Sequence, residues 1–306
     1  MTHGFVATNN NNEILISSDT RNLHLLAKLT SPTVTDSSSA YGGFVELTYT
    51  VDCPVTPVPF FTMPTGDYYS IAGIKNTTGN TWEIRIIRSG TGASYPEVYV
   101  FCDPRGISST ETHGMIVYRN DGSAAFDSRR RPLAITGGTA VTHPSNPRPS
   151  DPSGLSPKYC SSGNGNGGFT PNNENGPYGN AYMPNKPMFH YSSLAQAERQ
   201  ASYYQRDEEC TGFDAYGGCI GYGTSDEWWS TYWAFYRGGI RQSGTDIYGG
   251  WIVVNGGCWW SNYSDSDFVG IGTGSDSGNG GSSPYSNDTV NLGSTAVIIG
   301  DASRYD

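Results

Sequence analysis

The sequence predicts a mainly β protein. We expect an N-terminal β-sandwich domain with repeated hairpins over residues 1–140 and a Pro/Gly/Asn-rich connecting segment over 141–190. A C-terminal α+β domain with one helix and short strands follows over 191–306. Three observations predict this class: apolar and polar residues alternate in several short runs, the chain holds 40 glycines, and only 15% of its residues are charged. Short alternating runs separated by turn residues are typical of antiparallel sandwiches.

Residues 3–26 and 113–136 are two copies of one segment, aligned without a gap at an offset of 110 residues. Each copy has an apolar run, a polar turn and a second apolar run, which predicts a β-hairpin. Asp121-Gly122 forms the turn centre of the second copy and is typical of a type I′ turn. Asn11-Asn12 occupies the matching positions of the first copy, and Asn is among the few non-glycine residues that tolerate positive φ.

Four further strands are expected between the two copies, at residues 45–51, 68–74, 82–88 and 98–102. The first is the clearest, because its apolar and polar residues alternate with a period of two and therefore predict one buried face. Prolines interrupt the chain after it, since proline cannot donate to a strand ladder; they are Pro54, Pro57 and Pro59.

The opening of each copy resembles the start of many minor tail proteins of tailed bacteriophages. The residues that carry the resemblance are Gly4-Phe5-Val6, 9–12, 14–18, Asp19 and Arg21, repeated at 114–118, Asp121-Gly122, 126–128 and 131–133.

This resemblance covers residues 1–140 only. It implies a virion protein of the distal tail (tail tip, baseplate-associated or fibre-type) that is assembled in the host cytoplasm. It implies other phage tail proteins and further copies of the chain as partners, in three- or six-fold symmetry. It implies no catalytic residues and no cofactor.

Charge and hydropathy exclude several classes of function. The net charge is −10, and residues after 150 hold seven basic and 16 acidic residues. Nucleic acid is therefore a poor partner, because phosphate binding needs clustered Lys and Arg. We expect no membrane span, since no run of 18 apolar residues occurs. We expect no secretory signal either, because the N-terminus lacks a basic region followed by an apolar one.

The connecting segment and the C-terminal domain are expected to differ in structure from the N-terminal domain, which consists of strands. Residues 144–157 are proline-rich and predict an extended chain, while the following stretch is rich in Gly and Asn. Residues 193–209 predict the only helix, with Ser193 and Gln196 as a capping box. Apolar residues at helical spacing support it: Leu194, Ala197, Ala201 and Tyr204. Strands are expected at 231–237, 250–255 and 295–299.

Six of the seven tryptophans lie in the C-terminal domain. Trp and Tyr stack on sugar rings while carboxylates and amides bind the hydroxyls, so this cluster is a candidate contact for a host glycan or protein receptor. Its alternative role is to fill the core of a small domain. Adjacent tryptophans on a strand fall on opposite faces, so at most one of each pair is expected to be buried. The candidate residues are Asp226, Glu227, Trp228, Trp229, Tyr232, Tyr236, Trp259, Trp260, Asn262 and Tyr263.

The six cysteines and the acidic residues give weaker indications. No C-x-x-C motif occurs, so no metal site is predicted. The cysteines are either buried free thiols or partners in disulfides formed after release from the host, with Cys210, Cys219 and Cys258 as the candidates. Asp226, Glu227, Asp265 and Asp267 do not have a spacing that demands glycosidase chemistry. The sequence therefore predicts a non-enzymatic virion protein, with a carbohydrate-binding module or a polysaccharide hydrolase as alternatives.

Overall fold

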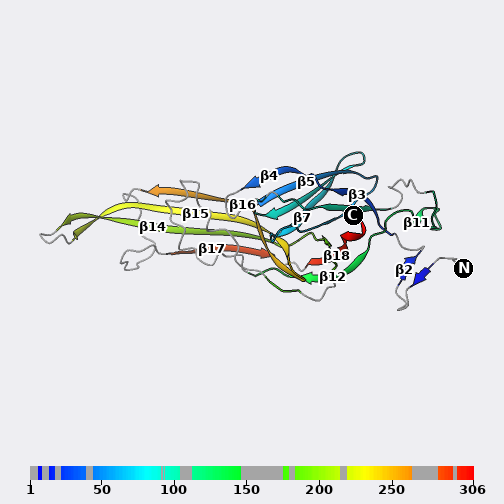
Figure 1. The fold of residues 1–306 in the computed structure, drawn as a ribbon. Helices are drawn as coiled ribbons and strands as arrows, with labels where there is room; N and C mark the ends of the chain where they lie inside the picture. The colour runs from blue at the N-terminus through cyan, green and yellow to red at the C-terminus, as the bar shows by residue number, and fades with distance from the viewer. Residues whose placement is uncertain are drawn as a thin grey trace.

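The protein is mainly β, as the sequence predicts (Figure 1). The computed structural model describes residues 6–8, 14–17, 22–38, 44–90, 92, 94–103, 112–145, 175–178, 183–213, 219–263, 282–291 and 295–306, with the backbone alone for β1, β2, Ser38 and the stretches 198–234 and 255–291. Among these residues the helical structure is one short 3-10 helix, η5 (Ala302–Arg304).

Two antiparallel sheets form the body of the protein. The larger has eight strands in the order β17-β14-β15-β7-β8-β5-β4, with β16 paired to β15. Its strands are β4 (Thr33–Ser38), β5 (Phe44–Asp52), β7 (Tyr69–Thr78), β8 (Thr81–Ser89), β14 (Gln196–Phe213), β15 (Cys219–Ser243), β16 (Asp246–Tyr263) and β17 (Ser282–Asn291). The smaller has six strands in the order β12-β18-β13-β6-β9-β3. They are β3 (His24–Leu29), β6 (Val58–Phe61), β9 (Val98–Cys102), β12 (Ile135–Val141), β13 (Pro187–His190) and β18 (Thr295–Asp301).

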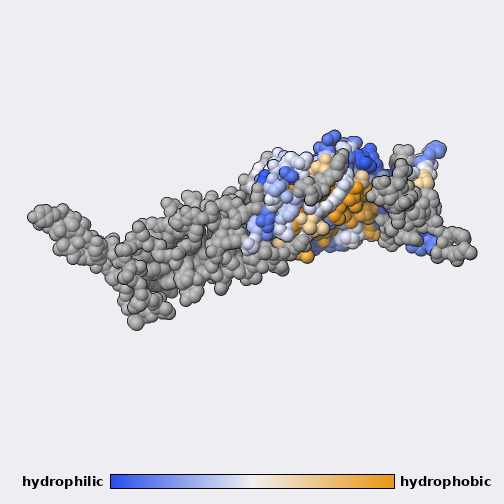
Figure 2. Space-filling view, turned by 90° about the horizontal axis from the view of Figure 1, so that it is seen from below, coloured by the Kyte–Doolittle hydropathy of each residue, from blue (hydrophilic) through white to orange (hydrophobic). Residues whose placement is uncertain are grey.

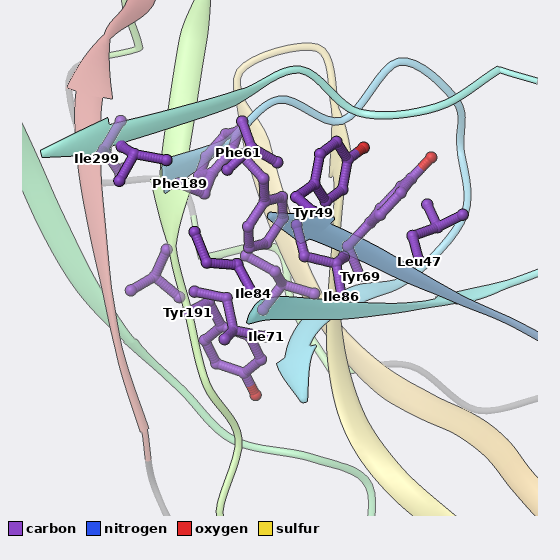
Figure 3. Packing of buried hydrophobic residues seen from close by; sticks show 14 of the residues in the cluster. Leu47, Tyr49, Phe61, Tyr69, Ile71, Ile84, Ile86, Phe189, Tyr191 and Ile299 are labelled. Carbon is purple, nitrogen blue, oxygen red and sulfur yellow. The ribbon is translucent and has the colours of Figure 1, made fainter. Parts of the chain in front are cut away.

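One apolar core joins the two sheets into a sandwich (Figure 3). Strand β5 shows why, because its alternating residues Val45, Leu47, Tyr49 and Val51 are all buried, as a period of two requires. The smaller sheet contributes Phe61, Val98, Val100, Phe189, Val297 and Ile299 to the same cluster. The chain therefore forms a sandwich, but strands β13 and β18 contribute to it as well as residues 1–140, to which the sequence prediction confined it.

The outer face of the smaller sheet carries a second apolar cluster. Phe60, Tyr99, Phe101 and Met188 alternate with the core residues of their strands and pack against Ala302 and Tyr305. Viewed from below, hydrophobic residues gather on the body of the protein, with hydrophilic residues around them (Figure 2). The segment from Ala302 to Tyr305 thus covers part of a surface that the sheet alone would leave exposed.

Four strands of the larger sheet continue beyond the sandwich as a long ribbon. The strands β14, β15, β16 and β17 run outward side by side in one layer (Figure 1). Strand β15 has 25 residues and β14 has 18, so at about 3.3 Å per residue they extend for about 80 Å and about 60 Å. The sequence predicts short strands within β15 and β16. The prediction of short strands is wrong, because both strands are much longer.

Both copies of the repeat form the predicted hairpins. Strand β1 (Val6–Thr8) pairs with β2 (Ile14–Ser17), and β10 (Ile116–Tyr118) pairs with β11 (Ala124–Asp127). The registers are the same at the offset of 110 residues: Val6 pairs with Ser17 and Ile116 with Asp127, and both ladders shift at the matching position. Strand β2 lies beside β11, so the two hairpins are neighbours.

The turn of the second hairpin differs from the predicted type I′ turn. Gly122 N–H donates to the carbonyl of Arg119, and Arg119 N–H donates to the carbonyl of Ser123. Gly122 has a φ of 78°. This pattern is a three-residue loop with a glycine bulge, in which Asp121 precedes the positive-φ residue. The Asp121 carboxylate accepts from Ser123 N–H at 2.9 Å, which favours this turn. Asn11 and Asn12 lie outside the described residues.

The predicted helix at 193–209 is wrong, because most of this segment is strand β14. From Gln196 to Tyr203, β14 pairs with β15 on one side and with β17 on the other. Burial from Ser193 to Ala197 alternates with a period of two, and Leu194 is 74% exposed instead of anchoring a helical face. Ser193 Oγ does accept a backbone bond, from Ala195 N–H at 3.0 Å. Pairing on both edges therefore overrides the local helical pattern.

The smaller sheet draws strands from all three predicted segments. Strand β13 comes from the connecting segment and pairs with β18 from the C-terminal part. It also pairs with β6 from the N-terminal part, through Phe189 and Phe61. The end of the proline-rich connection is thus an interior strand of the sandwich.

Candidate functional site

The candidate contact residues lie on the ribbon, where β15 pairs with β16. The register aligns Glu227 with Tyr263, Trp228 with Asn262, Trp229 with Ser261, Ser230 with Trp260, Thr231 with Trp259 and Tyr232 with Cys258. Asp226 immediately precedes Glu227 on β15, next to the first of these pairs. The structure therefore brings together two groups of candidates that are about 30 residues apart in the sequence.

The register divides these candidates between the two faces of the ribbon. Paired residues of an antiparallel ladder share a face, and neighbours along a strand alternate. One face continues the buried positions Tyr236 and Ile240, and we call it the core-side face. The other continues Phe235, which is 37% exposed, and we call it the open face. The core-side face holds Trp228, Tyr232, Trp260 and Asn262, and the open face holds Glu227, Trp229, Trp259 and Tyr263.

The structure removes Tyr236 from the candidate contact residues. It is only 2% exposed and belongs to the interior of the protein. Its register partners on the neighbouring strands, Ala197 and Val253, are buried too. A side chain enclosed on this rung cannot stack on a ligand from solution, so Tyr236 is not available as a contact residue.

A buried polar cluster holds the root of the ribbon. His143 is 2% exposed, and the Tyr191 hydroxyl is hydrogen-bonded to its Nε2 at 2.8 Å. The indole N–H of Trp251 donates to the Pro144 carbonyl at 3.1 Å. Burial disfavours the charged imidazolium and lowers the pKa of His143 to about 4. This cluster joins the end of β12 to β16.

Glycines on neighbouring rungs make that close approach feasible. The register aligns Gly238 with Trp251, Gly239 with Gly250 and Ile240 with Gly249. A Cβ at Gly249 would overlap the carbonyl oxygen of Thr142, and one at Gly250 would overlap the ring of Tyr68. The ribbon can leave the sandwich in this direction because Gly249 and Gly250 have no side chains.

At the other end of the body, the second hairpin is docked on strand β3. Leu25 N–H donates to the Arg131 carbonyl at 2.8 Å, and Leu133 N–H donates to the Leu23 carbonyl at 2.7 Å. The buried His24 accepts from Asp127 N–H through Nε2 at 3.4 Å. Strand β3 is the last strand of the smaller sheet, so the segment after β11 covers its free edge.

Asp127 organises the segment that makes this contact. Its carboxylate accepts from Arg129 Nε at 2.8 Å and Nη2 at 2.7 Å, and pairs with Arg130 Nε at 3.2 Å. The bonds from Arg129 lower the pKa of Asp127, against the opposing effect of burial. Gly114 packs against this arrangement, because a Cβ there would overlap Arg129 and Ser128. The glycine and serine shared by the two repeats are thus in contact in the second copy.

Four charged groups surround the buried Tyr99 on the smaller sheet. Lys28 Nζ lies 2.9 Å from Glu97 and 2.6 Å from Asp306, and Lys186 Nζ lies 2.6 Å and 2.7 Å from the same carboxylates. The Tyr99 hydroxyl lies within hydrogen-bonding distance of both carboxylates. The lysines hold the pKa of Asp306 well below its usual range. This network is internally neutralised and binds the C-terminal segment to the sheet.

The register does not bring the three candidate disulfide cysteines together. Cys210 is opposite Tyr222, Cys219 is opposite Phe213, and Cys258 is opposite Tyr232. Cys258 is therefore about 30 Å along the ribbon from Cys210 and about 40 Å from Cys219, beyond the reach of a disulfide. Cys53 and Cys102 are buried free thiols, and burial first, then the influence of the Cys53 thiol, raises the pKa of Cys102 to about 12.

The geometry defines an elongated antiparallel β-sandwich that extends into a β-ribbon. Comparisons with protein-family models, curated proteins and solved structures find no match to the chain. In the part of the chain that the structure describes, no helix is long and apolar enough to cross a membrane. The same residues contain no group of three or more His, Cys, Asp or Glu side chains placed to hold a metal ion.

Sequence reasoning missed the clusters around His143, Asp127 and Tyr99. Only the Asp127 cluster could have been found in the sequence. Asp127 is followed by arginines at 129 and 130, and opposite charges two and three residues apart after a strand can pair locally. The other two clusters combine residues that are distant in the sequence.

Proposed function

We propose that this chain is a structural protein of a tailed-bacteriophage virion, located at the distal tail as a tail-tip, baseplate-associated or fibre-type component. The observation that carries the proposal is that the hairpins and the ribbon lie at opposite ends of one sandwich (Figure 1). The repeated hairpins, which carry the resemblance to minor tail proteins, lie at one end. The long aromatic ribbon extends from the other.

In this proposal the hairpin end attaches the protein to its neighbours in the tail. Met115 and Tyr118 on the second hairpin are exposed, and large exposed apolar residues are typical of surfaces that a partner covers. The hairpin is itself fixed to β3 by backbone bonds, so force applied there is transmitted to the sandwich. The function is attachment, and it needs neither a catalytic residue nor a cofactor.

The test is to purify phage particles and quantify the chain in them by mass spectrometry. We expect a constant number of copies in each particle. Particles assembled with Tyr118→Asp, which places a charge on a residue that is 58% exposed, should contain fewer copies. Asp36→Asn, an exposed change on β4, is the control and should leave the copy number unchanged. Purified particles without the protein would overturn the proposal.

A second role, contact with host surface glycan, is favoured by one observation. The register places Trp228, Tyr232, Trp260 and Asn262 on one face across β15 and β16. Aromatic residues next to an amide are the combination that binds sugar rings and their hydroxyls. We expect the protein to bind host envelope polysaccharide and Asn262→Ala with Trp228→Ala to abolish this binding. Equal binding by the wild type and the double variant would remove the glycan role.

A further inference from the structure

We infer that Cys53 and Cys102 are a disulfide site that joins the two sheets of the sandwich, and that the bond closes when the chain folds in the presence of a small-molecule disulfide. Cys53 follows the last residue of β5 in the larger sheet, and Cys102 is the last residue of β9 in the smaller sheet. The inference does not rest on the virion role, because it concerns the sandwich alone.

Each cysteine continues the core-facing side of its strand. Val51, two residues before Cys53, and Val100, two residues before Cys102, belong to the core between the sheets. Side chains alternate along a strand with a period of two, so the cysteines face the same core. Both are 0% exposed. The Cys53 N–H donates to the Asn80 carbonyl at 2.7 Å, so the ladder of β5 extends to this residue.

Contacts between the sheets align β5 and β9 in the same direction. Arg88, the register partner of Val45, donates to the carbonyl of Ser94 ahead of β9. Further along β5, the Tyr49 hydroxyl donates to the Pro96 carbonyl at 2.5 Å. Moving along β5 from its start to its end therefore also moves towards the start of β9 and then along it. The far ends of the two strands, where the cysteines lie, therefore face each other across the core.

The pKa of Cys102 also indicates that the two thiols are neighbours. Burial raises this pKa most, and the next influence is that of the Cys53 thiol. A neighbouring group acts in this way within about 6 Å. Antibody domains bridge their two sheets with a core disulfide, so the spacing of a sandwich permits such a bond. Both cysteines lie where their strands end, and the backbone there can adjust to the geometry of the bond.

The bond forms by two thiol–disulfide exchanges with a small disulfide such as oxidised glutathione. One cysteine thiolate attacks a glutathione sulfur, which forms a mixed disulfide and releases one glutathione thiolate. The second cysteine thiolate then attacks the protein sulfur of that mixed disulfide, which closes the bond and releases the second glutathione thiolate. The two protons of the cysteine thiols are taken up by the released glutathione thiolates. Two electrons pass from the cysteines to the glutathione disulfide, which is reduced to two thiols.

Burial determines when these exchanges can occur. The thiolate is the attacking species, and in the folded protein Cys102 is enclosed and its pKa is raised. Exchange is therefore confined to the chain before the sheets close over the cysteines. The folded protein keeps the redox state in which it folded, because the same enclosure protects a buried bond from reductants.

The experiment is to unfold the reduced full chain and refold it either with a mixture of oxidised and reduced glutathione or with dithiothreitol alone. Free thiols are then blocked by alkylation in denaturant, and the tryptic peptides are identified by mass spectrometry. Trypsin places Cys53 in peptide 29–75 and Cys102 in peptide 89–105, so the bond joins two separate peptides. We expect this linked pair in most of the oxidised protein. Folded reduced protein in the same glutathione buffer should stay reduced at both positions.

A stability comparison tests whether the native fold accommodates the bond. The bond closes a loop of about 50 residues and restricts the unfolded chain, so it should raise the ratio of folded to unfolded protein in urea at least about tenfold. Cys53→Ala should lose both the linked peptides and the difference between oxidised and reduced samples. Cys102→Ala gives the same readout where Cys53→Ala does not fold. Cys258→Ala is the matched control and should keep both.

Several results overturn the inference. Cys53 and Cys102 that remain reduced after oxidative refolding, or that pair with other cysteines, overturn it. So does an oxidised protein that is no more stable than the reduced one. Folded reduced protein that oxidises as fast as the refolding chain overturns the confinement of the reaction to folding. All of these results leave the virion proposal standing, because copy number in particles is measured separately.

Discussion

Lys28 Nζ and Asp306 Oδ1 are 2.6 Å apart although 278 residues separate them in the sequence. The pair joins the edge strand β3 to the segment that follows η5, above the buried ring of Tyr99. Lys186 and Glu97 complete the network, so each carboxylate faces two ammonium groups. The second apolar cluster of the sandwich is therefore bordered by an electrostatic contact between residues that are far apart in the sequence.

Replacing Asp306 by Asn should destabilise the fold by about 1 kcal/mol, because partly exposed ion pairs contribute little singly and more in a network. The pKa of Asp306 is lowered in the folded protein. Its contribution is therefore complete above the unfolded pKa of about 4 and is lost as the pH falls through the folded pKa. Urea unfolding at neutral pH measures the loss. Asp36→Asn is the control, and equal midpoints for both variants would contradict the network.

His143 should make the protein sensitive to mild acid. Its folded pKa of about 4 is below the ordinary histidine value of 6.5, so between these values the unfolded chain binds a proton that the folded chain does not. Stability should fall as the pH drops from about 6.5 to about 4, by about 3 kcal/mol in total. His143→Gln should flatten the dependence of the unfolding free energy on pH, apart from the smaller part due to the buried His24. An unchanged slope, or the same flattening in the control His113→Gln, would contradict this role.

The local features of this fold could be predicted from the sequence. The hairpins are visible because Val6 and Ile116 belong to two aligned copies, and each ladder is closed by residues less than 15 positions apart. The alternation of β5 can be recognised in the sequence for the same reason, since all the residues of its buried face lie within one short segment. Adjacent tryptophans such as Trp228 and Trp229 were expected on opposite faces of a strand, and the register of β15 places them so.

Features that depend on distant partners could not be predicted. Ser193 and the residues after it carry a convincing helical pattern, yet β15 and β17 occupy both edges of the segment and make it a strand. Phe189 sits at the end of a proline-rich stretch, and only its pairing with Phe61 and Ile299 shows that it is an interior strand. Local propensity is a weak guide wherever the ladder comes from elsewhere in the chain.

Gly249 should tolerate no side chain. In Gly249→Ala the new Cβ would overlap the backbone oxygen of Thr142, which cannot rotate away as a flexible side chain could. We expect a loss of about 2 to 3 kcal/mol, as for other overpacked sites, measured by thermal or urea unfolding. Gly66→Ala is the matched control, because a Cβ at Gly66 has no atom within 4 Å. Similar stability of the two variants would contradict the close approach at the root of the ribbon.

Asp127 should control the docking of the second hairpin on β3. In Asp127→Asn the charge that faces Arg129 and Arg130 is lost at a buried position, and we expect a cost of about 2 kcal/mol because both arginines remain. Arg129, Arg130 and Arg131 are consecutive, so trypsin reports the release directly, and the variant should be cut there faster than the wild type. The pKa of Asp127 is lowered in the folded protein. As the pH falls through that pKa, the carboxylate loses its charge, and the segment of the wild type should be released as readily as that of the variant. Asp121→Asn, in the turn of the same hairpin, is the control and should keep the arginines protected; equal cleavage of both variants would show that Asp127 does not hold the segment in place.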